Sequence, residues 1–299
     1  MNRVANKLAG RLNAGPIRLF LLTQCCLAML LMVPVATAVA ESLSSNEKQQ
    51  RIISTDAGTT EIIIALGKGE SLVGVDVTSS LPETLSPAKV GYHRNLAAEG
   101  LLSLAPSMIF GNEHIGPKET VDALKRAQVR LVLQPTATAP QQLVDNIQQV
   151  ARVLDISGDA LIRQVDQAQR SINERLSLRN NSETSNAVFI LYLQGRGFKQ
   201  AGAGTSGDAL LQLLGVKNDA SYKGYRSISA EGLLAIQPDL VLIASQDPGA
   251  VDQLLQQYPV LKHSQAFKNQ KMLVVDASTL VSGISIGAMN EAARLAQAL

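Results

Sequence analysis

Three side chains that could contact a ligand stand next to one another in the sequence. Tyr92 offers a phenol oxygen, His93 an imidazole and Arg94 a guanidinium group. They follow a strand-like segment and precede a helical one, and loops in that position commonly bind ligands in α/β folds. A tyrosine oxygen can bind ferric iron, and the charge of Arg94 would favour the phenolate form. Without further information, packing or a hydrogen bond is the more frequent role of a loop tyrosine.

A glycine-rich stretch at residues 202–207 matches the GxGxxG pattern of dinucleotide-binding loops. In those folds the pattern follows its strand directly, but here residues 194–201 separate it from a predicted strand that ends near Leu193. The context therefore argues against a nucleotide site. Two interpretations remain: a loop in which Thr205 or Ser206 caps the next helix, or backbone amides that face an anionic part of a ligand.

The other familiar catalytic and metal-binding patterns are missing from the sequence. His93, His114 and His263 are scattered and form no HxH or HxxxH pair, whereas a zinc site needs three or four ligands. We expect His114 and His263 to lie at the surface. No nucleophile elbow, HExxH motif or phosphate loop occurs. A catalytic triad assembled from distant residues stays open, but no motif signals one.

The first forty residues have the three-part pattern of a secretory signal. Four basic residues and no acidic ones precede or flank the apolar run 19–35, and Ala38-Val39-Ala40 provides small residues before Glu41. This order predicts cleavage after Ala40 and export to the periplasm, because the segment is too short and wrongly flanked for a membrane span. A retained membrane anchor is the alternative.

Removal of this segment changes what the composition implies. Both cysteines, Cys25 and Cys26, lie inside it, and Gln24 does not fit the small residue that precedes a lipoprotein cysteine. The mature chain would have no disulfide and no thiolate metal site. It would retain 23 basic and 25 acidic residues, a net charge near −2. Such a chain lacks the basic surface that binds nucleic acid.

Alternating strands and helices predict an α/β fold with two domains. The pattern favours a parallel sheet covered on both faces. In the first half we expect strands at 51–54, 72–75, 108–110 and 129–133, with helices at 59–66, 96–104 and 118–127. Residues 140–179 predict one or two helices, the later one long. The second half predicts strands at 187–193, 240–244 and 272–275, and helices at 205–214, 230–236 and 286–299.

An internal repeat supports two related domains. Residues 98–106 and 230–238 are identical at six of nine positions, and an apolar strand follows each copy. Glu99 and Glu231 occupy equal positions near the start of the predicted helices, where a carboxylate is favoured by the helix dipole. Chance similarity of an ordinary helix–Pro–strand unit is the less favoured explanation.

Residues from about 51 to 299 resemble the periplasmic haem-binding proteins of bacterial haem ABC importers. The resemblance depends on residues 55–61, on Val90-Gly91-Tyr92 with 98–100, and on 201–205 with 208–211. It implies two Rossmann-like lobes joined by a single long helix, which fits residues 158–179. The expected boundaries are 1–40 for the signal peptide, 41–50 for a flexible leader, 51–155 for the N-terminal lobe, 156–182 for the linking helix and 183–299 for the C-terminal lobe.

The resemblance also implies roles for individual residues. Tyr92 would be the axial ligand of the haem iron, whereas residues 193–196, where some members have a histidine, contain none. Glu99 and Glu231 would dock onto arginines of the inner-membrane permease dimer. Basic groups would bind the propionates of haem, and the remaining candidates for the haem site are His93, Arg94, Arg196, Tyr225 and Arg226.

The sequence thus predicts a non-enzymatic transport protein that delivers haem, its ligand, to an ABC permease. We expect a monomer, with an outer-membrane haem receptor upstream and no nucleic-acid partner. A ferric-siderophore or cobalamin binder is the alternative of the same class, because those ligands need no protein atom on the metal. An exported enzyme on a chelatase-like two-lobed fold is the alternative of another class.

Overall fold

A computed structural model describes residues 50–178, 186–193 and 197–299. Residues 50–299 form one compact unit. The predicted signal peptide with Cys25 and Cys26, most of the leader, and Arg196 lie outside the described residues. Within the part that the structure describes, no helix is both long and apolar enough to cross a membrane.

The first lobe is a five-stranded sheet in which every strand is parallel to its neighbours, in the order β3-β2-β1-β4-β5. Its strands are β1 (Ile52–Ser54), β2 (Leu72–Val75), β3 (Ala88–Lys89), β4 (Met108–Asn112) and β5 (Arg130–Gln134). The helices between them are α3 (Ala57–Ala65), α4 (Ala98–Ser103) and α5 (Lys118–Arg126). The parallel sheet predicted for this half of the chain is confirmed.

The second lobe has a mixed sheet, in the order β11-β10-β6-β7-β9, with β8 beside β6. Its core strands β6 (Asn186–Leu193), β10 (Leu240–Ser245) and β11 (Met272–Asp276) are parallel. The sheet is mixed because β7 (Gly197–Ala201), a strand that the sequence did not predict, runs antiparallel to both β6 and β9 (Tyr225–Ser227). The remaining elements are β8 (Lys217–Asn218), α8 (Ser206–Leu213), α9 (Ala230–Ile236), α10 (Ala250–Gln257), α11 (Gln265–Lys268) and α12 (Ile286–Ala298).

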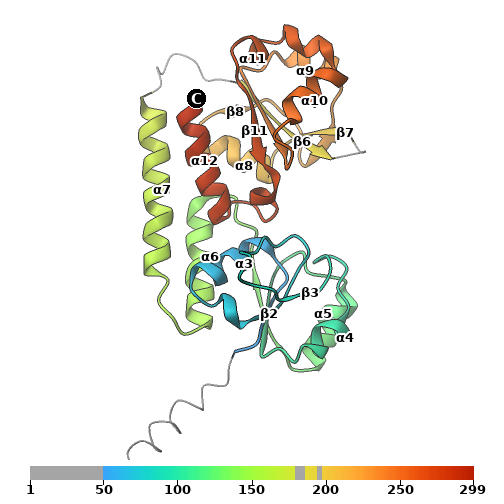
Figure 1. Cartoon of the computed structure of the whole chain (residues 1–299), viewed down its shortest axis with the longest axis vertical. Helices are drawn as coiled ribbons and strands as arrows, with labels where there is room; N and C mark the ends of the chain where they lie inside the picture. Colours follow the sequence, from blue (N-terminus) through green and yellow to red (C-terminus); the bar gives the residue numbers. More distant parts are fainter. Residues whose placement is uncertain (1–49, 179–185, 194–196) are drawn as a thin grey trace, which may run out of the picture. The chain divides into compact units, whose positions relative to one another are not determined.

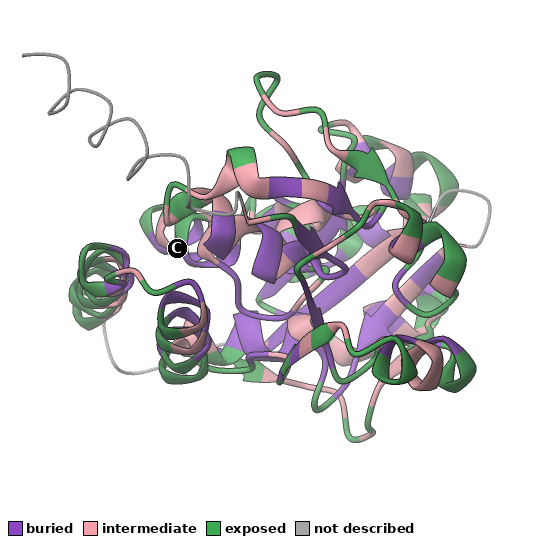
Figure 2. Cartoon of the chain, turned by 90° about the horizontal axis from the view of Figure 1, so that it is seen from below, coloured by how far each residue is buried: buried purple, intermediate pink, exposed green. Residues whose placement is uncertain are grey.

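Buried residues on both faces explain why the central strands read as continuous apolar runs (Figure 2). Successive side chains of a strand point to opposite faces, so Ile52 and Ile53 belong to different core clusters. Leu242 and Ile243 of β10 are divided in the same way. One of these clusters contains residues from both lobes and from the helices between them.

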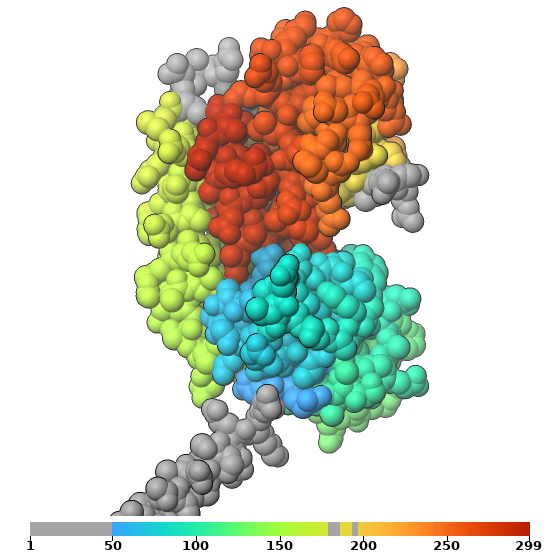
Figure 3. Space-filling model, viewed as in Figure 1, coloured from blue at the N-terminus to red at the C-terminus, as the bar shows by residue number. Residues whose placement is uncertain are grey.

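Two helices connect the sheets: α6 (Pro140–Val153) and the long α7 (Asp159–Ser177). Helix α7 contacts α6 and α12 and lies beside α12 in Figures 1 and 3. Leu161, Val165 and Ile172 are its buried residues, and their spacings of four and seven place them on one apolar stripe. Ile162, Ala168 and Leu176 are partly buried beside this stripe, and most other residues of the helix are polar and exposed.

The segment before α12 is bonded to the first lobe. Ile284 N donates to Ala137 O at 2.7 Å, and the Ser282 hydroxyl donates to Asp56 Oδ1 at 2.7 Å. Gly283 has a φ of +80°, and a Cβ there would lie 2.2 Å from Ala137 O. Only glycine fits where residue 283 packs against Ala137. Gly283 therefore allows this close contact between the segment before α12 and the first lobe.

Glu61 of the first lobe forms a further contact with the N-terminus of α12. Gly287 N, in the first turn of α12, donates to Glu61 Oε2 of α3 at 3.0 Å. Burial raises the pKa of Glu61, and hydrogen bonds from Gly287 and Ser285 offset only part of that effect. The carboxylate lies at a helix N-terminus, where a negative charge is favoured.

The internal repeat is a repeat of structure as well as of sequence. Ala98 and Ala230, which are 132 positions apart, begin α4 and α9, and β4 and β10 follow them. Ala105 and Gln237 occupy equal positions before the two prolines and have left-handed φ angles of +46° and +50°. Both copies therefore end their helix with the same turn, which favours a duplicated unit over chance.

Candidate functional site

Tyr92 lies on a turn at the carboxyl edge of the first sheet, immediately after β3. Gly91 has a φ of +102°, and its carbonyl accepts a hydrogen bond from Val77 N at 3.0 Å. Asn95 N donates to Tyr92 O at 2.8 Å and closes the turn. The residue remains 45% exposed, so the backbone is held while the phenol stays accessible to a ligand.

Hydrogen bonds to neighbouring loops hold both sides of this turn. Gly116 N donates to His93 O at 2.8 Å, and Leu96 N donates to Gly116 O at 2.9 Å. The Thr120 hydroxyl donates to Leu96 O at 2.7 Å. A loop tied in this way is a rigid support, and binding sites on rigid supports lose less entropy when a ligand binds.

The three adjacent candidates have different surroundings. His93 is buried, with Nδ1 3.5 Å from Asp76 Oδ2, and its ring centroid lies 4.3 Å from that of Tyr92. Arg94 is exposed and forms no ion pair with any carboxylate of the described residues. The structure therefore brings Tyr92 and His93 together, and its geometry leaves the guanidinium of Arg94 available to an anion.

Val77 is a neighbour that the sequence analysis missed. It is 54% exposed. Its backbone N donates a hydrogen bond to the carbonyl of Gly91, the residue before Tyr92. An exposed valine next to an exposed tyrosine offers an apolar surface. The signal that could have found it is its position just after β2, at the carboxyl edge of the sheet.

The candidates of the second lobe lie in strand β9 or outside the described residues. Tyr225 is half-buried against the core, and its hydroxyl lies 3.4 Å from the Ser206 hydroxyl. The guanidinium carbon of Arg226 lies 4.5 Å from the ring centroid of Tyr222, a cation–π contact. Among the described residues, no hydrogen bond, aromatic contact or cation–π contact joins Tyr225 or Arg226 to Tyr92.

The glycine-rich stretch has a structural role, so the anion-binding interpretation is wrong for its first three amides. Gly202 N donates to Gly224 O at 2.8 Å, Ala203 N donates to Tyr222 O at 2.8 Å, and Gly204 N donates to Asp208 Oδ2 at 3.1 Å. Thr205 caps α8 by accepting from Asp208 N, as predicted. Strand β7 does precede the stretch directly, but it is antiparallel to β6, so no βαβ unit forms.

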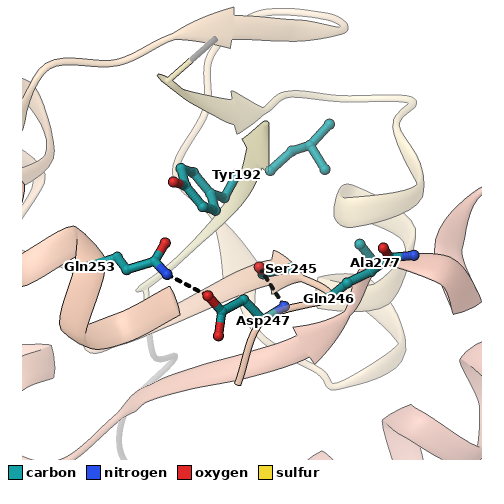
Figure 4. A pocket seen from close by; sticks show the side chains of 7 residues that line it. Tyr192, Ser245, Gln246, Asp247, Gln253 and Ala277 are labelled. Carbon is teal, nitrogen blue, oxygen red and sulfur yellow. Dashed lines mark hydrogen bonds between the residues drawn. The ribbon is translucent and has the colours of Figure 1, made fainter. Parts of the chain in front are cut away.

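A pocket lies at the carboxyl ends of β6 and β10 in the second lobe (Figure 4). Its volume is about 330 Å³, within the range of small-molecule sites. Its lining comprises Leu191, Tyr192, Ser245, Gln246, Asp247, Gln253 and Ala277.

Hydrogen bonds order the polar side of this pocket. Asp247 accepts from the side chain of Gln253 and from Gly249 N at 2.8 Å. A second pocket shares Ser245 and Gln246 with the first and includes Ser80, which lies in the first-lobe loop that also carries Val77. These pocket residues were not predicted, because they come from strand ends far apart in the sequence.

Comparison with known proteins decides the family. Residues 52–279 match the family model described as periplasmic binding protein. The chain belongs to this family. The crystal structure of the periplasmic heme-binding protein HutB of Vibrio cholerae is similar to it, with 32% identity and a TM-score of 0.75, over 84% of this chain and 99% of that chain. The resemblance and fold class drawn from the sequence are thereby confirmed.

Two curated relatives belong to the same comparison. The uncharacterized ABC transporter substrate-binding lipoprotein YvrC of Bacillus subtilis is 20% identical over 215 residues, 70% of this chain and 68% of that protein. The vitamin B12-binding protein of Vibrio parahaemolyticus is 27% identical over 112 residues, 37% of this chain and 40% of that protein.

In this periplasmic binding protein, Glu99 and Glu231 are both exposed in the first turns of α4 and α9. Neither carboxylate forms an ion pair within the described residues. Ser229 caps α9 by accepting from Gly232 N at 3.1 Å, whereas Ala97 gives α4 no side-chain cap. The two glutamates are therefore equivalent in position and available to a partner.

Proposed function

We propose that this periplasmic binding protein captures haem and delivers it to an ABC permease of the inner membrane. The observation that carries the proposal is the exposed phenol of Tyr92 on a turn held by hydrogen bonds on both sides. The similarity to HutB, which is named a heme-binding protein, supports haem as the ligand. Haem would be cargo, so the role is binding and delivery rather than catalysis.

Each part of haem would have a chemical partner among the proposed residues. The Tyr92 oxygen would bind ferric iron, as a tyrosine does in some haem proteins. The apolar porphyrin face would rest on exposed side chains such as Val77. Propionates would take charge-assisted hydrogen bonds from Arg94, with Arg196 and Arg226 as further candidates. His93 and Tyr225 complete the set of residues proposed for the haem site.

We further propose how the protein is exported, where it receives haem and how it docks onto the permease. Residues 1–40 would direct export and be removed after Ala40, and the monomer would receive haem that an outer-membrane receptor admits. Residues 51–155 and 183–299 would form the two lobes, linked by 156–182. Glu99 and Glu231 would then bind arginines of the permease dimer through charge-assisted hydrogen bonds.

An absorption titration tests the ligand. Purified protein beginning at Glu41 should bind haemin stoichiometrically, with an intense Soret band and a ferric tyrosinate spectrum. Parallel titration with cyanocobalamin serves as the control, since a vitamin B12-binding protein is among the relatives. Tight binding of cyanocobalamin without binding of haemin would replace this proposal with the cobalamin alternative.

A further inference from the structure

A buried histidine and a buried aspartate lie directly behind the exposed Tyr92. His93 is 7% exposed, and the side chain of Asp76 is completely buried. The Tyr92 and His93 rings have centroids 4.3 Å apart and planes inclined by 48°. The phenol is therefore partly exposed, and the buried imidazole of His93 is in contact with its ring.

Asp76 is fixed at the end of β2. Its backbone N donates to Ser54 O at 3.0 Å, and the Ser79 hydroxyl donates to Oδ1 at 2.6 Å. The Thr78 hydroxyl donates to Oδ2. Burial raises the pKa of Asp76, but the neighbouring His93 imidazole and hydrogen bonds from Ser79 and Thr78 outweigh it and lower the pKa below its usual value. The residue is thus an anchored carboxylate.

His93 has little freedom between this carboxylate and the tyrosine. Its carbonyl accepts from Gly116 N at 2.8 Å. Its buried Nδ1 has no full hydrogen bond, and the Asp76 carboxylate, 3.5 Å away, is the charged group it faces. The imidazole is consequently set at a fixed angle against the phenol.

We infer that His93, oriented by Asp76, is a positioning residue for Tyr92. Its ring supports the phenol and sets the direction in which the oxygen meets the iron. This role differs from direct contact with haem, and it rests on the proposed function. Groups behind a metal ligand fix its orientation, and their loss weakens metal binding by about 10- to 100-fold.

Another histidine of the same lobe provides a matched control. Nε2 of His114 lies 3.6 Å from Glu113 Oε1, a separation like that of the buried pair, but the two side chains are 43% and 47% exposed. Solvent screens such a pair, and His114 touches no tyrosine ring among the described residues. Substitution of His114 should leave haem binding unchanged.

The test compares His93→Leu, which keeps bulk without a planar ring, with His93→Phe, which keeps the ring. The measurements are the ferric tyrosinate absorption band and the rate of haemin dissociation, with thermal unfolding to verify the fold. His93→Leu should shift the band and speed dissociation about 10- to 100-fold, and Asp76→Asn should shift the band in the same direction. His93→Phe keeps a ring but loses the interaction with Asp76, so its band and dissociation rate should lie between those of His93→Leu and wild type. His114→Leu should stay close to wild type.

Folded His93→Leu with a wild-type band and dissociation rate would overturn the inference. If His93→Leu does not fold, a wild-type band in Asp76→Asn would overturn it, and a shifted band there would support it. A wild-type protein that binds haemin without a tyrosinate band would overturn the ligand assignment itself. The two failures are therefore distinguishable.

Discussion

The segments that precede α4 and α9 align in the repeat but have different structures. In the first lobe, residues 91–96 form a turn that leaves Tyr92 45% exposed. In the second lobe, the corresponding residues contain β9, which pairs with β7 and holds Tyr225 half-buried. His93 and Tyr225, 132 positions apart, thus occupy equal positions in the sequence and unequal environments. Where the first lobe has an exposed turn, the second lobe has an edge strand paired with an antiparallel neighbour.

What the two lobes share is the helix that follows. Glu99 and Glu231 keep the same place in α4 and α9, although only α9 has a side-chain cap. The proposed ligand turn is thus confined to one lobe, whereas the proposed docking carboxylate is present in both. Substitutions at paired positions test this difference between the lobes.

The largest effect is expected for the shared carboxylates. Glu99→Ala or Glu231→Ala alone should lower haem uptake by cells about tenfold through loss of one charge-assisted hydrogen bond, and the double variant should nearly stop it. Glu119→Ala is the control, because Glu119 is an exposed first-turn glutamate of α5 outside the repeat. Haemin binding in solution should be unaffected in all four proteins. Normal uptake by the double variant would remove the docking role.

A smaller effect, on haemin affinity, is expected for the two candidate propionate-binding arginines that the structure describes, Arg94 and Arg226. Arg94→Ala should weaken haemin binding about tenfold, since an ionised pair with a propionate would be lost. Arg226→Ala should leave affinity within about twofold, because that guanidinium already lies over Tyr222. Fluorescence titration with haemin gives both constants. A greater loss for Arg226→Ala would place the ligand nearer β9 than we propose.

The smallest effect concerns the unequal helix caps. Ser229→Ala should lower the free energy of unfolding by about 1 kcal/mol, the usual contribution of a capping side chain. Ala97→Ser should raise it by a smaller amount, because α4 gains a cap that it lacks. Urea unfolding measures both changes. Equal effects of opposite sign would show that the two helix ends are interchangeable.

The central strands of each lobe could be predicted because a strand that is buried on both faces appears in the sequence as a continuous apolar run. Residues 240–244 and 187–193 are such runs, and both became strands at nearly the predicted bounds. Strands β7 and β9 could not be predicted in this way. Their sequences are short and carry Lys199, Gln200 and Arg226, so they become strands by pairing with one another and with β6.

The candidate site was proposed from residue types in a single loop. Tyr92 and Arg94 were selected because a phenol and a guanidinium follow a strand-like segment, and the structure places both exposed on one turn. Burial of His93 could not be predicted, since it depends on Asp76, which follows β2 in another loop. The pocket around Asp247 was missed for the same reason: its lining comes from strand ends that meet only in the folded chain.

The most direct test of the central claim is the visible absorption spectrum of haemin bound to Tyr92→Phe and to Tyr225→Phe. Tyr92→Phe should lose the ferric tyrosinate band and bind haemin about 100-fold more weakly, a cost of about 2.7 kcal/mol. Tyr225→Phe should keep the band and lose much less affinity than Tyr92→Phe, because Tyr225 is not proposed to bind the iron. An unchanged spectrum in Tyr92→Phe, together with loss of the band in Tyr225→Phe, would contradict the assignment of the ligand to the first lobe.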